Sequence, residues 1–167
     1  LETMLKASNN FDISTNISFS KNKNIDYKTN FNGEVTDWGD TDISFSPNLI
    51  SSIAFNYNPK KDMNISLLNK FVGDQYMSNT ESVVSKLNSY STTDLNLIYS
   101  FKKSKYFNEI IFTAMLNNIF NKEYVSNGYY YTYDDTWSDP NIVTTIEGTG
   151  YYPQAKRNFL IGFTFKL

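Results

Sequence analysis

The last ten residues, Asn158-Phe159-Leu160-Ile161-Gly162-Phe163-Thr164-Phe165-Lys166-Leu167, decide the fold class. From Phe159 to Leu167 every second residue is large and apolar. A period of two is that of a β-strand with one apolar face. About ten residues is also the length that a tilted strand needs to cross a bilayer. The C-terminus therefore predicts a strand with one face turned toward an apolar environment.

The same period of two recurs in five segments upstream. Their apolar rows lie at 11–19, 49–57, 63–67, 95–101 and 110–116. Residues 2–6 are expected to complete a seventh strand that begins upstream. The sequence thus predicts an all-β, antiparallel, up-and-down sheet of six or seven strands.

The connections between these segments alternate between long and short. Long polar loops are expected at 21–47, 73–89 and 121–153, and tight turns at 58–61 and 102–105. Transmembrane barrels show this asymmetry, with short turns on the periplasmic side and long loops outside. Aromatic residues near both ends of the strands are typical of the two girdles at headgroup depth. The pattern predicts a transmembrane β-barrel wall with the C-terminus on the short-turn side.

The composition excludes several classes of function. The chain of 167 residues has no Cys, no His and a net charge of -2, and it contains 13 Tyr and 13 Phe. Without Cys or His there is no disulfide, no thiolate metal site and no Ser-His triad, so we expect no enzyme activity and no cofactor. The balanced charge gives no electrostatic footprint for nucleic acid. No run of about 18 apolar residues predicts a transmembrane helix.

An apolar sheet face of this extent needs a cover. Soluble monomers rarely expose contiguous apolar patches beyond roughly 300–600 Å², and a soluble β-sandwich would show turns about every 8 to 12 residues. We therefore expect outer-membrane lipid to cover the face. Six or seven strands leave two open edges in hydrocarbon, so we expect the remainder of the barrel, and a leader sequence, to precede Leu1.

Several short motifs occur in an order that is similar to one family. The clearest is Asn117-Asn118-Ile119-Phe120-Asn121-Lys122-Glu123-Tyr124, followed by Ser126-Asn127-Gly128-Tyr129. Further pieces lie at 46–48, 70–76, 87–90 and 152–159. Together they resemble the C-terminal barrel segment of TonB-dependent outer-membrane receptors of Bacteroidetes-type bacteria. The end of the chain resembles the signal read by the barrel-assembly machinery, carried here by Gly162, Phe163, Phe165 and Leu167, although the usual last residue is Phe.

The resemblance implies a 22-stranded barrel with a plugged lumen in the outer membrane of a Gram-negative bacterium. Residues 1–167 would form its C-terminal part, without the plug and the earlier strands. It implies import of a scarce small molecule, a metal chelate such as a siderophore, haem or a cobalamin-like compound, driven by TonB, ExbB and ExbD through the plug. The alternatives are a carbohydrate or peptide importer of the same family, a structural or adhesive surface barrel without transport, and a soluble secreted β-sandwich.

The third long loop has the most unusual local composition. It reads Tyr129-Tyr130-Tyr131-Thr132-Tyr133-Asp134-Asp135-Thr136-Trp137-Ser138-Asp139. Rigid rings with few rotors suit capture of a flat ligand. The alternative is that a large loop uses these rings to pack on its neighbours. We predict ligand contacts at Tyr130, Tyr131, Tyr133, Trp137 and Trp38.

Acidic residues offer a second candidate site. Asp134, Asp135 and Asp139, with Glu147 nearby, carry the carboxylates that Ca²⁺ binds, but no EF-hand-like spacing is present. A solvated acidic loop is the preferred interpretation, as it is for the acidic residues around Trp38. Four charged residues on the inward rows are expected to face a water-filled lumen or the plug: Asp12, Asp94, Glu109 and Lys166. The lysines of the short turns suit phospholipid headgroups or simply solubility: Lys60, Lys61, Lys102, Lys103 and Lys105.

Overall fold

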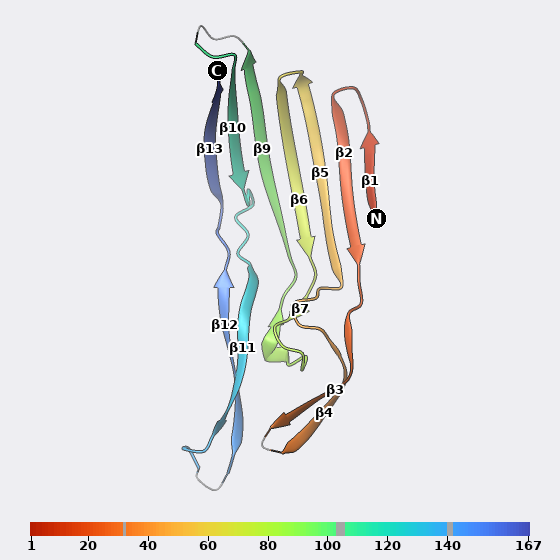
Figure 1. The fold of residues 1–167 in the computed structure, drawn as a ribbon, viewed down its shortest axis with the longest axis vertical. Helices are drawn as coiled ribbons and strands as arrows, with labels where there is room; N and C mark the ends of the chain where they lie inside the picture. Colours follow the sequence, from red (N-terminus) through yellow and green to blue (C-terminus); the bar gives the residue numbers. More distant parts are fainter. Residues whose placement is uncertain (32, 103–105, 140–141) are drawn as a thin grey trace.

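A seven-stranded antiparallel sheet forms the centre of the computed structural model, which describes residues 1–31, 33–102, 106–139 and 142–167. Each strand pairs with its neighbour in the meander, so the sheet runs up and down (Figure 1). The order is β1 (Glu2–Lys6), β2 (Phe11–Phe19), β5 (Leu49–Lys60), β6 (Met63–Val72), β9 (Tyr90–Lys102), β10 (Glu109–Asn117) and β13 (Asn158–Lys166). The predicted strands and their antiparallel order are confirmed.

The register places the predicted apolar rows on one face of the sheet. Directly opposed residues of an antiparallel pair share a face. One apolar row crosses all seven strands in this way: Leu5, Ile13, Phe55, Leu67, Leu95, Leu116 and Phe159. The opposite face is largely polar and carries the four charged residues predicted to point inward: Asp12, Asp94, Glu109 and Lys166.

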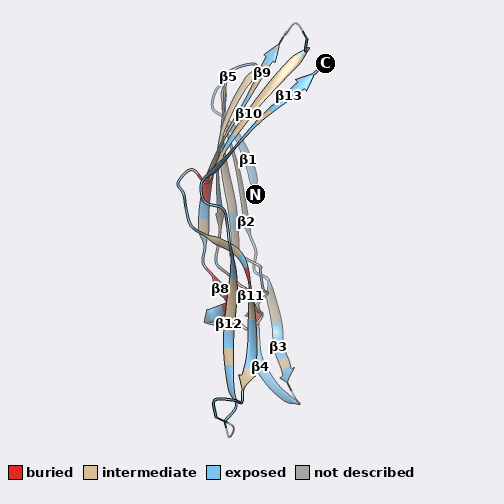
Figure 2. Ribbon diagram, turned by 90° about the vertical axis from the view of Figure 1, so that its left-hand side faces the viewer, coloured by how far each residue is buried: buried red, intermediate tan, exposed pale blue. Residues whose placement is uncertain are grey.

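The sheet has no second layer. Seen from the side it is one thin, curved layer (Figure 2). Among the described residues, the only buried large apolar side chains are Met77 and Leu87, and both lie in the loops below the sheet. Phe159 in β13 is 75% exposed and Phe163 is 59% exposed. The chain therefore does not form the β-sandwich of the soluble alternative, and its apolar face is open to an external cover.

Short and long connections lie at opposite ends of the sheet, and the C-terminus lies at the short-turn end (Figure 1). The turn predicted at 58–61 lies slightly later, at residues 61–62. The reason is that β5 continues to Lys60 through an irregularity in its pairing with β6 between Tyr57 and Lys60. Pro59 has no N–H to donate, and a break in the ladder is where a strand tolerates proline. Residues 103–105 of the other predicted turn lie outside the described residues.

The three long connections lie where they were predicted, and they contain secondary structure that the sequence analysis did not predict. The first holds a hairpin of β3 (Lys23–Phe31) and β4 (Glu34–Asp42). The second holds β7 (Gln75–Tyr76), the 3-10 helix η1 (Val83–Ser85) and β8 (Lys86–Leu87), and the third a hairpin of β11 (Val125–Asp135) and β12 (Thr144–Pro153). No helix in the described part of the chain is long and apolar enough to cross a membrane.

Candidate functional site

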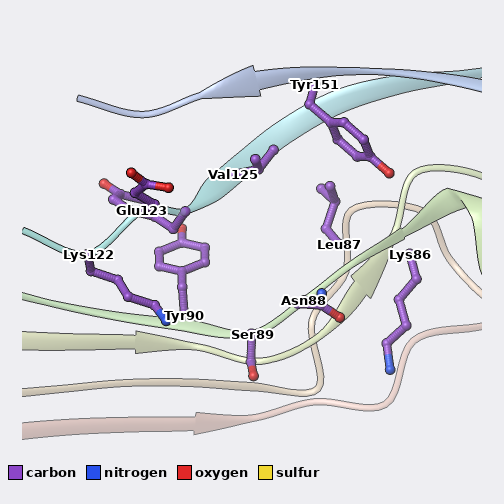
Figure 3. A pocket seen from close by; sticks show the side chains of 10 residues that line it. Lys86, Leu87, Asn88, Ser89, Tyr90, Lys122, Glu123, Val125 and Tyr151 are labelled. Carbon is purple, nitrogen blue, oxygen red and sulfur yellow. The ribbon is translucent and has the colours of Figure 1, made fainter. Parts of the chain in front are cut away.

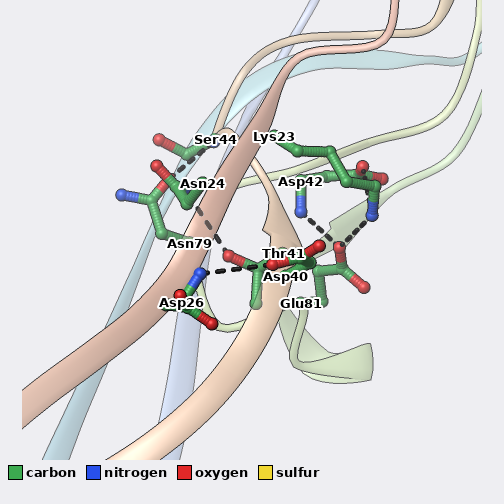
Figure 4. Close-up of polar contacts among 9 residues, drawn as sticks. All are labelled: Lys23, Asn24, Asp26, Asp40, Thr41, Asp42, Ser44, Asn79 and Glu81. Carbon is green, nitrogen blue, oxygen red and sulfur yellow. Dashed lines mark hydrogen bonds and ion pairs between the residues drawn. The ribbon is translucent and has the colours of Figure 1, made fainter.

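The first and second long loops are joined by a polar cluster (Figure 4). The Lys23 ammonium lies 3.1 Å from Asp42 and 3.5 Å from Glu81. The Asp42 backbone N–H also donates to Glu81, and the Ser44 N–H donates to the Asn79 side chain at 2.7 Å. Hydrogen bonding to Asp42 is the main reason that the pKa of Lys23 is raised above its ordinary value. The cluster holds the β3–β4 hairpin against the second loop.

The second loop also packs against the β11–β12 hairpin. Met77 is almost fully buried and lies against Gly128, where an added Cβ would come within 2.7 Å of the Met77 sulfur. The Tyr130 hydroxyl donates to Glu147 at 2.5 Å, and burial is the main reason that the pKa of Tyr130 is raised. The second loop therefore links both hairpins into one body.

One face of the β11–β12 hairpin carries four tyrosines in a row. Tyr129, Tyr131 and Tyr133 alternate along β11, and Tyr152 continues the row from β12. Neighbouring ring centroids lie 6.0 Å, 6.1 Å and 6.4 Å apart, and the two pairs within β11 are tilted by only 25° and 17°. Each side chain is about half exposed. We call these four residues the tyrosine row, and they form a flat amphipathic surface.

Two glycines on the opposite strand make room for this row. Tyr131 pairs with Gly148 and Tyr129 pairs with Gly150. A Cβ at Gly148 would come within 2.4 Å of Tyr131 Cζ, and one at Gly150 within 2.3 Å of Tyr129 Cζ. Neither glycine has a positive φ, so the rings rather than the backbone conformation require glycine here. The rings therefore lie down over the neighbouring strand.

The structure separates the predicted ligand contacts. It places Tyr131 and Tyr133 in the tyrosine row, whereas Tyr130 points to the opposite face, toward the second loop. Trp137 lies just beyond the end of β11 and is 79% exposed, while the Trp38 indole N–H on β4 donates to Thr29 at 2.9 Å. Sequence reasoning missed Tyr129 and Tyr152. Two sequence patterns would have found them. Tyr129, Tyr131 and Tyr133 stand at every second position of one segment, and Gly148, Gly150 and Tyr152 stand at every second position of the segment that pairs with it.

The acidic residues of the third loop serve the turn that follows β11. Asp135 accepts hydrogen bonds from the N–H groups of Trp137 and Ser138, at 2.9 Å and 3.2 Å, and from the Ser138 hydroxyl at 2.6 Å. These bonds lower the pKa of Asp135. Asp134 accepts from the Thr145 hydroxyl at 2.8 Å. Within the described residues, no group of three His, Cys, Asp or Glu side chains is arranged to hold a metal ion, so the geometry adds no support for Ca²⁺ at Asp134, Asp135 and Asp139.

A cavity of about 330 Å³ opens between the second and third loops (Figure 3). Tyr90 and Tyr124 stack at a centroid distance of 4.4 Å along one part of its wall. Leu87 and Tyr151 line another part, and Lys86, Asn88, Ser89, Lys122 and Glu123 complete the wall, so the lining combines aromatic with charged and polar groups. Burial is the main reason that the pKa of Tyr124 is raised. The volume is at the lower end of small-molecule sites.

The stretch after β10 forms a polar anchor at the base of the third loop. Asn118 is only 4% exposed and has a φ of 50°. Its side-chain amide donates to the backbone oxygens of Lys122 and Ala155, at 2.8 Å and 3.3 Å, and its side-chain oxygen accepts from the Lys122 N–H at 2.9 Å. Its own N–H donates to Asp94 at 2.8 Å. The backbone and side chain of Asn118 together thus tie β9, the end of β10 and the return of the loop to one another.

Comparison with known proteins finds a likeness in fold alone. No protein-family model and no curated protein sequence matches the chain. Among solved structures, the chain is similar to the crystal structure of the siderophore receptor PiuA from Acinetobacter baumannii, with a TM-score of 0.69 and 14% sequence identity. The match covers 98% of this chain and 20% of the receptor chain. The chain thus has the fold of a part of that receptor and spans about one fifth of its length.

Proposed function

We propose that this chain is barrel wall and loops of an outer-membrane receptor that imports a scarce nutrient, and that it catalyses no reaction. The observation that supports this most directly is the likeness to a siderophore receptor over 98% of the chain. A single sheet with one apolar face and long loops at one end is also the construction of an outer-membrane barrel wall.

The exposed apolar face supports a membrane setting. Residues such as Phe159, Ile161 and Phe163 are more than half exposed, and in water each would lose the stabilisation of about 1.5–3 kcal/mol that burial of a large apolar side chain brings. β1 and β13 are the outermost strands of the sheet. Their free backbone groups need partners in hydrocarbon, so the complete barrel needs further strands at both edges.

In this proposal the cargo is a metal chelate, and import is driven by TonB, ExbB and ExbD through a plug contributed by the rest of the protein. The resemblance of residues 117–129 to motifs of Bacteroidetes-type receptors supports a TonB-dependent receptor. The tyrosine row and the aromatic cavity support capture of a flat ligand by the long loops. A 22-stranded barrel is the architecture that holds such a plug.

Growth of a deletion strain tests the proposal. A strain without the gene is grown with limiting iron, supplied as single ferric siderophores or haem, and in parallel with limiting cobalamin. We expect growth to fail on one of these sources and to return when the complete gene is restored, and a TonB deletion to give the same defect. A defect restricted to an oligosaccharide or a peptide source would indicate the other importers, and unchanged growth with reduced surface adhesion would indicate a structural barrel.

A further inference from the structure

The charge and shape of the third loop point to one kind of cargo. We infer that the tyrosine row is a contact surface for a flat metal chelate that carries no net negative charge. This inference rests on the proposed function, because it assumes that a chelate reaches the loops. It adds the surface that makes the contact and the charge that this surface accepts.

The hairpin part of the third loop, after Lys122, carries no cation. From Tyr124 to Ala155 the sequence contains no Lys or Arg, while it contains four acidic residues: Asp134, Asp135, Asp139 and Glu147. A surface with charges of one sign attracts ligands of the opposite sign and repels those of the same sign. The immediate surroundings of the tyrosine row therefore disfavour an anion.

Four lysines near the hairpin add little positive charge, because carboxylates lie against them. Lys28 lies 3.1 Å from Asp37, and Lys86 lies 2.8 Å from Asp74. Two further lysines pair in the same way, Lys23 with Asp42 and Glu81 and Lys156 with Glu123. Each of the three long loops has more acidic than basic residues. The potential around the hairpins is therefore negative.

The rings impose the same preference. The face of an aromatic ring is the negative end of its quadrupole, so it attracts a cation or an apolar plane. Tyr129, Tyr131 and Tyr133 lie nearly parallel, and centroid separations of 6.1 Å and 6.4 Å make the row wide enough to contact a molecule larger than one ring. Only phenol hydroxyls add polarity. A neutral or cationic flat chelate fits this surface.

Binding to the complete receptor in detergent micelles tests the inference. The probes are two flat zinc porphyrins of similar size, a neutral complex with four hydroxyphenyl groups and an anionic complex with four carboxyphenyl groups, and equilibrium dialysis of the zinc measures each Kd. We expect the unaltered receptor to bind the neutral complex at least about tenfold more tightly than the anionic one.

Two variants and a matched control connect this binding to the tyrosine row. Tyr131→Ala removes a ring, and Gly148→Ala keeps the ring but fills the space that it occupies, 2.4 Å from the added Cβ. Each is expected to weaken binding of the neutral complex about three- to tenfold, whereas Thr149→Ala, on the opposite face of the same strand, leaves it unchanged. Gel electrophoresis of unheated and heated samples verifies that each variant is assembled, because a folded barrel changes its mobility when it is heated.

The outcomes separate this inference from the proposed function. If the receptor binds the anionic complex as tightly as the neutral one, or if folded Tyr131→Ala and Gly148→Ala bind normally, the inference is wrong and the proposed function stands. If neither complex binds and the deletion strain grows on every metal source, both are wrong.

Discussion

Asn118 shows how a single residue can fix the base of a long loop. An L-residue at a φ of 50° is strained, and Asn tolerates this region better than most. The amide of Asn118 satisfies two backbone oxygens and one N–H that would otherwise lack partners in a nearly closed site. The motif around residues 117–124 therefore has a structural cause, whatever ligand the loops bind.

Replacing this side chain tests its role. Asn118→Ala leaves the Lys122 and Ala155 groups without their partner, and we expect it to lower the free energy of unfolding by about 2–4 kcal/mol. Asn117→Ala is the control, because Asn117 makes one exposed side-chain bond, to Asn158 at 3.0 Å, and should cost less than about 1 kcal/mol. Urea unfolding of the complete protein in detergent measures both. Equal effects would show that Asn118 is not an anchor.

The ion pair between Asp74 and Lys86 makes the second loop sensitive to pH. Lys86 at 2.8 Å and the Ser89 N–H at 2.6 Å lower the pKa of Asp74, and Asp74 raises the pKa of Lys86. The contribution of Asp74 is therefore present above its unfolded pKa of about 4 and is lost as pH falls through the lower folded value. That of Lys86 is present below about pH 10 and is lost as pH rises through its raised value.

Hydrogen exchange measures this pH dependence of the second loop directly. At neutral pH we expect the backbone amides of residues 74–89 to be protected, and at a pH near 3 we expect protection to fall, after correction for the intrinsic exchange rate. In Asp74→Asn the neutral-pH protection is expected to be low already and to change little with acid. A second loop whose protection is the same at both pH values would contradict the role of this pair.

Among the elements, the sheet strands were predictable and the hairpins in the loops were not. Alternation of apolar with polar residues identifies a strand with one apolar face, and all seven sheet strands carry at least part of such a row. β3 does carry Ile25, Tyr27 and Phe31 in one alternating row, and the Asn32-Gly33 pair in the sequence is a hairpin signal. In β4 the large apolar residues Val35 and Trp38 do not alternate, and the polar residues around both segments hid the hairpin. In β11 the residues Tyr129, Tyr131 and Tyr133 do alternate, but Tyr130 between them hid the period of two.

The candidate site was predictable in place but not in geometry. The sequence pointed to the Tyr-rich loop and to Tyr131 and Tyr133. It could not separate these from Tyr130, because the side to which a residue points depends on the register with β12, where Tyr131 meets Gly148. The ties between loops, such as Lys23 with Glu81, join residues 58 positions apart and leave no local pattern.

Two neighbouring residues of β9 test which face of the sheet meets lipid. Leu97 shares the apolar face with Ile65 and Ala114, and Ile98 lies on the opposite face. Leu97→Arg places a charge against hydrocarbon, which costs about 2–4 kcal/mol near the middle of the bilayer. Ile98→Arg introduces the same side chain on the polar face and should be nearly neutral. Unfolding of the complete barrel in lipid vesicles measures both, and equal destabilisation would contradict a lipid cover.

At the scale of the whole molecule, stability depends on what lies beyond the two edges of the sheet. β1 is only five residues long, whereas β13 pairs along all nine residues with β10 and leaves its other side open. An exposed, apolar edge strand is a site for pairing with another chain. Because none of the described large apolar side chains of the sheet strands is fully buried, the sheet lacks the hydrophobic core that holds a soluble domain together.

We therefore expect residues 1–167, expressed alone, not to be a stable monomer in plain buffer. The chain should aggregate in water, or enter detergent without the cooperative unfolding of a closed barrel, because each unpaired edge group in an apolar medium costs several kcal/mol. Light scattering after size-exclusion chromatography measures the mass, and hydrogen exchange reports protection at β13. A compact monomer in buffer, with Phe159, Phe163 and Phe165 protected from solvent, would overturn both the lipid cover and the barrel that it implies.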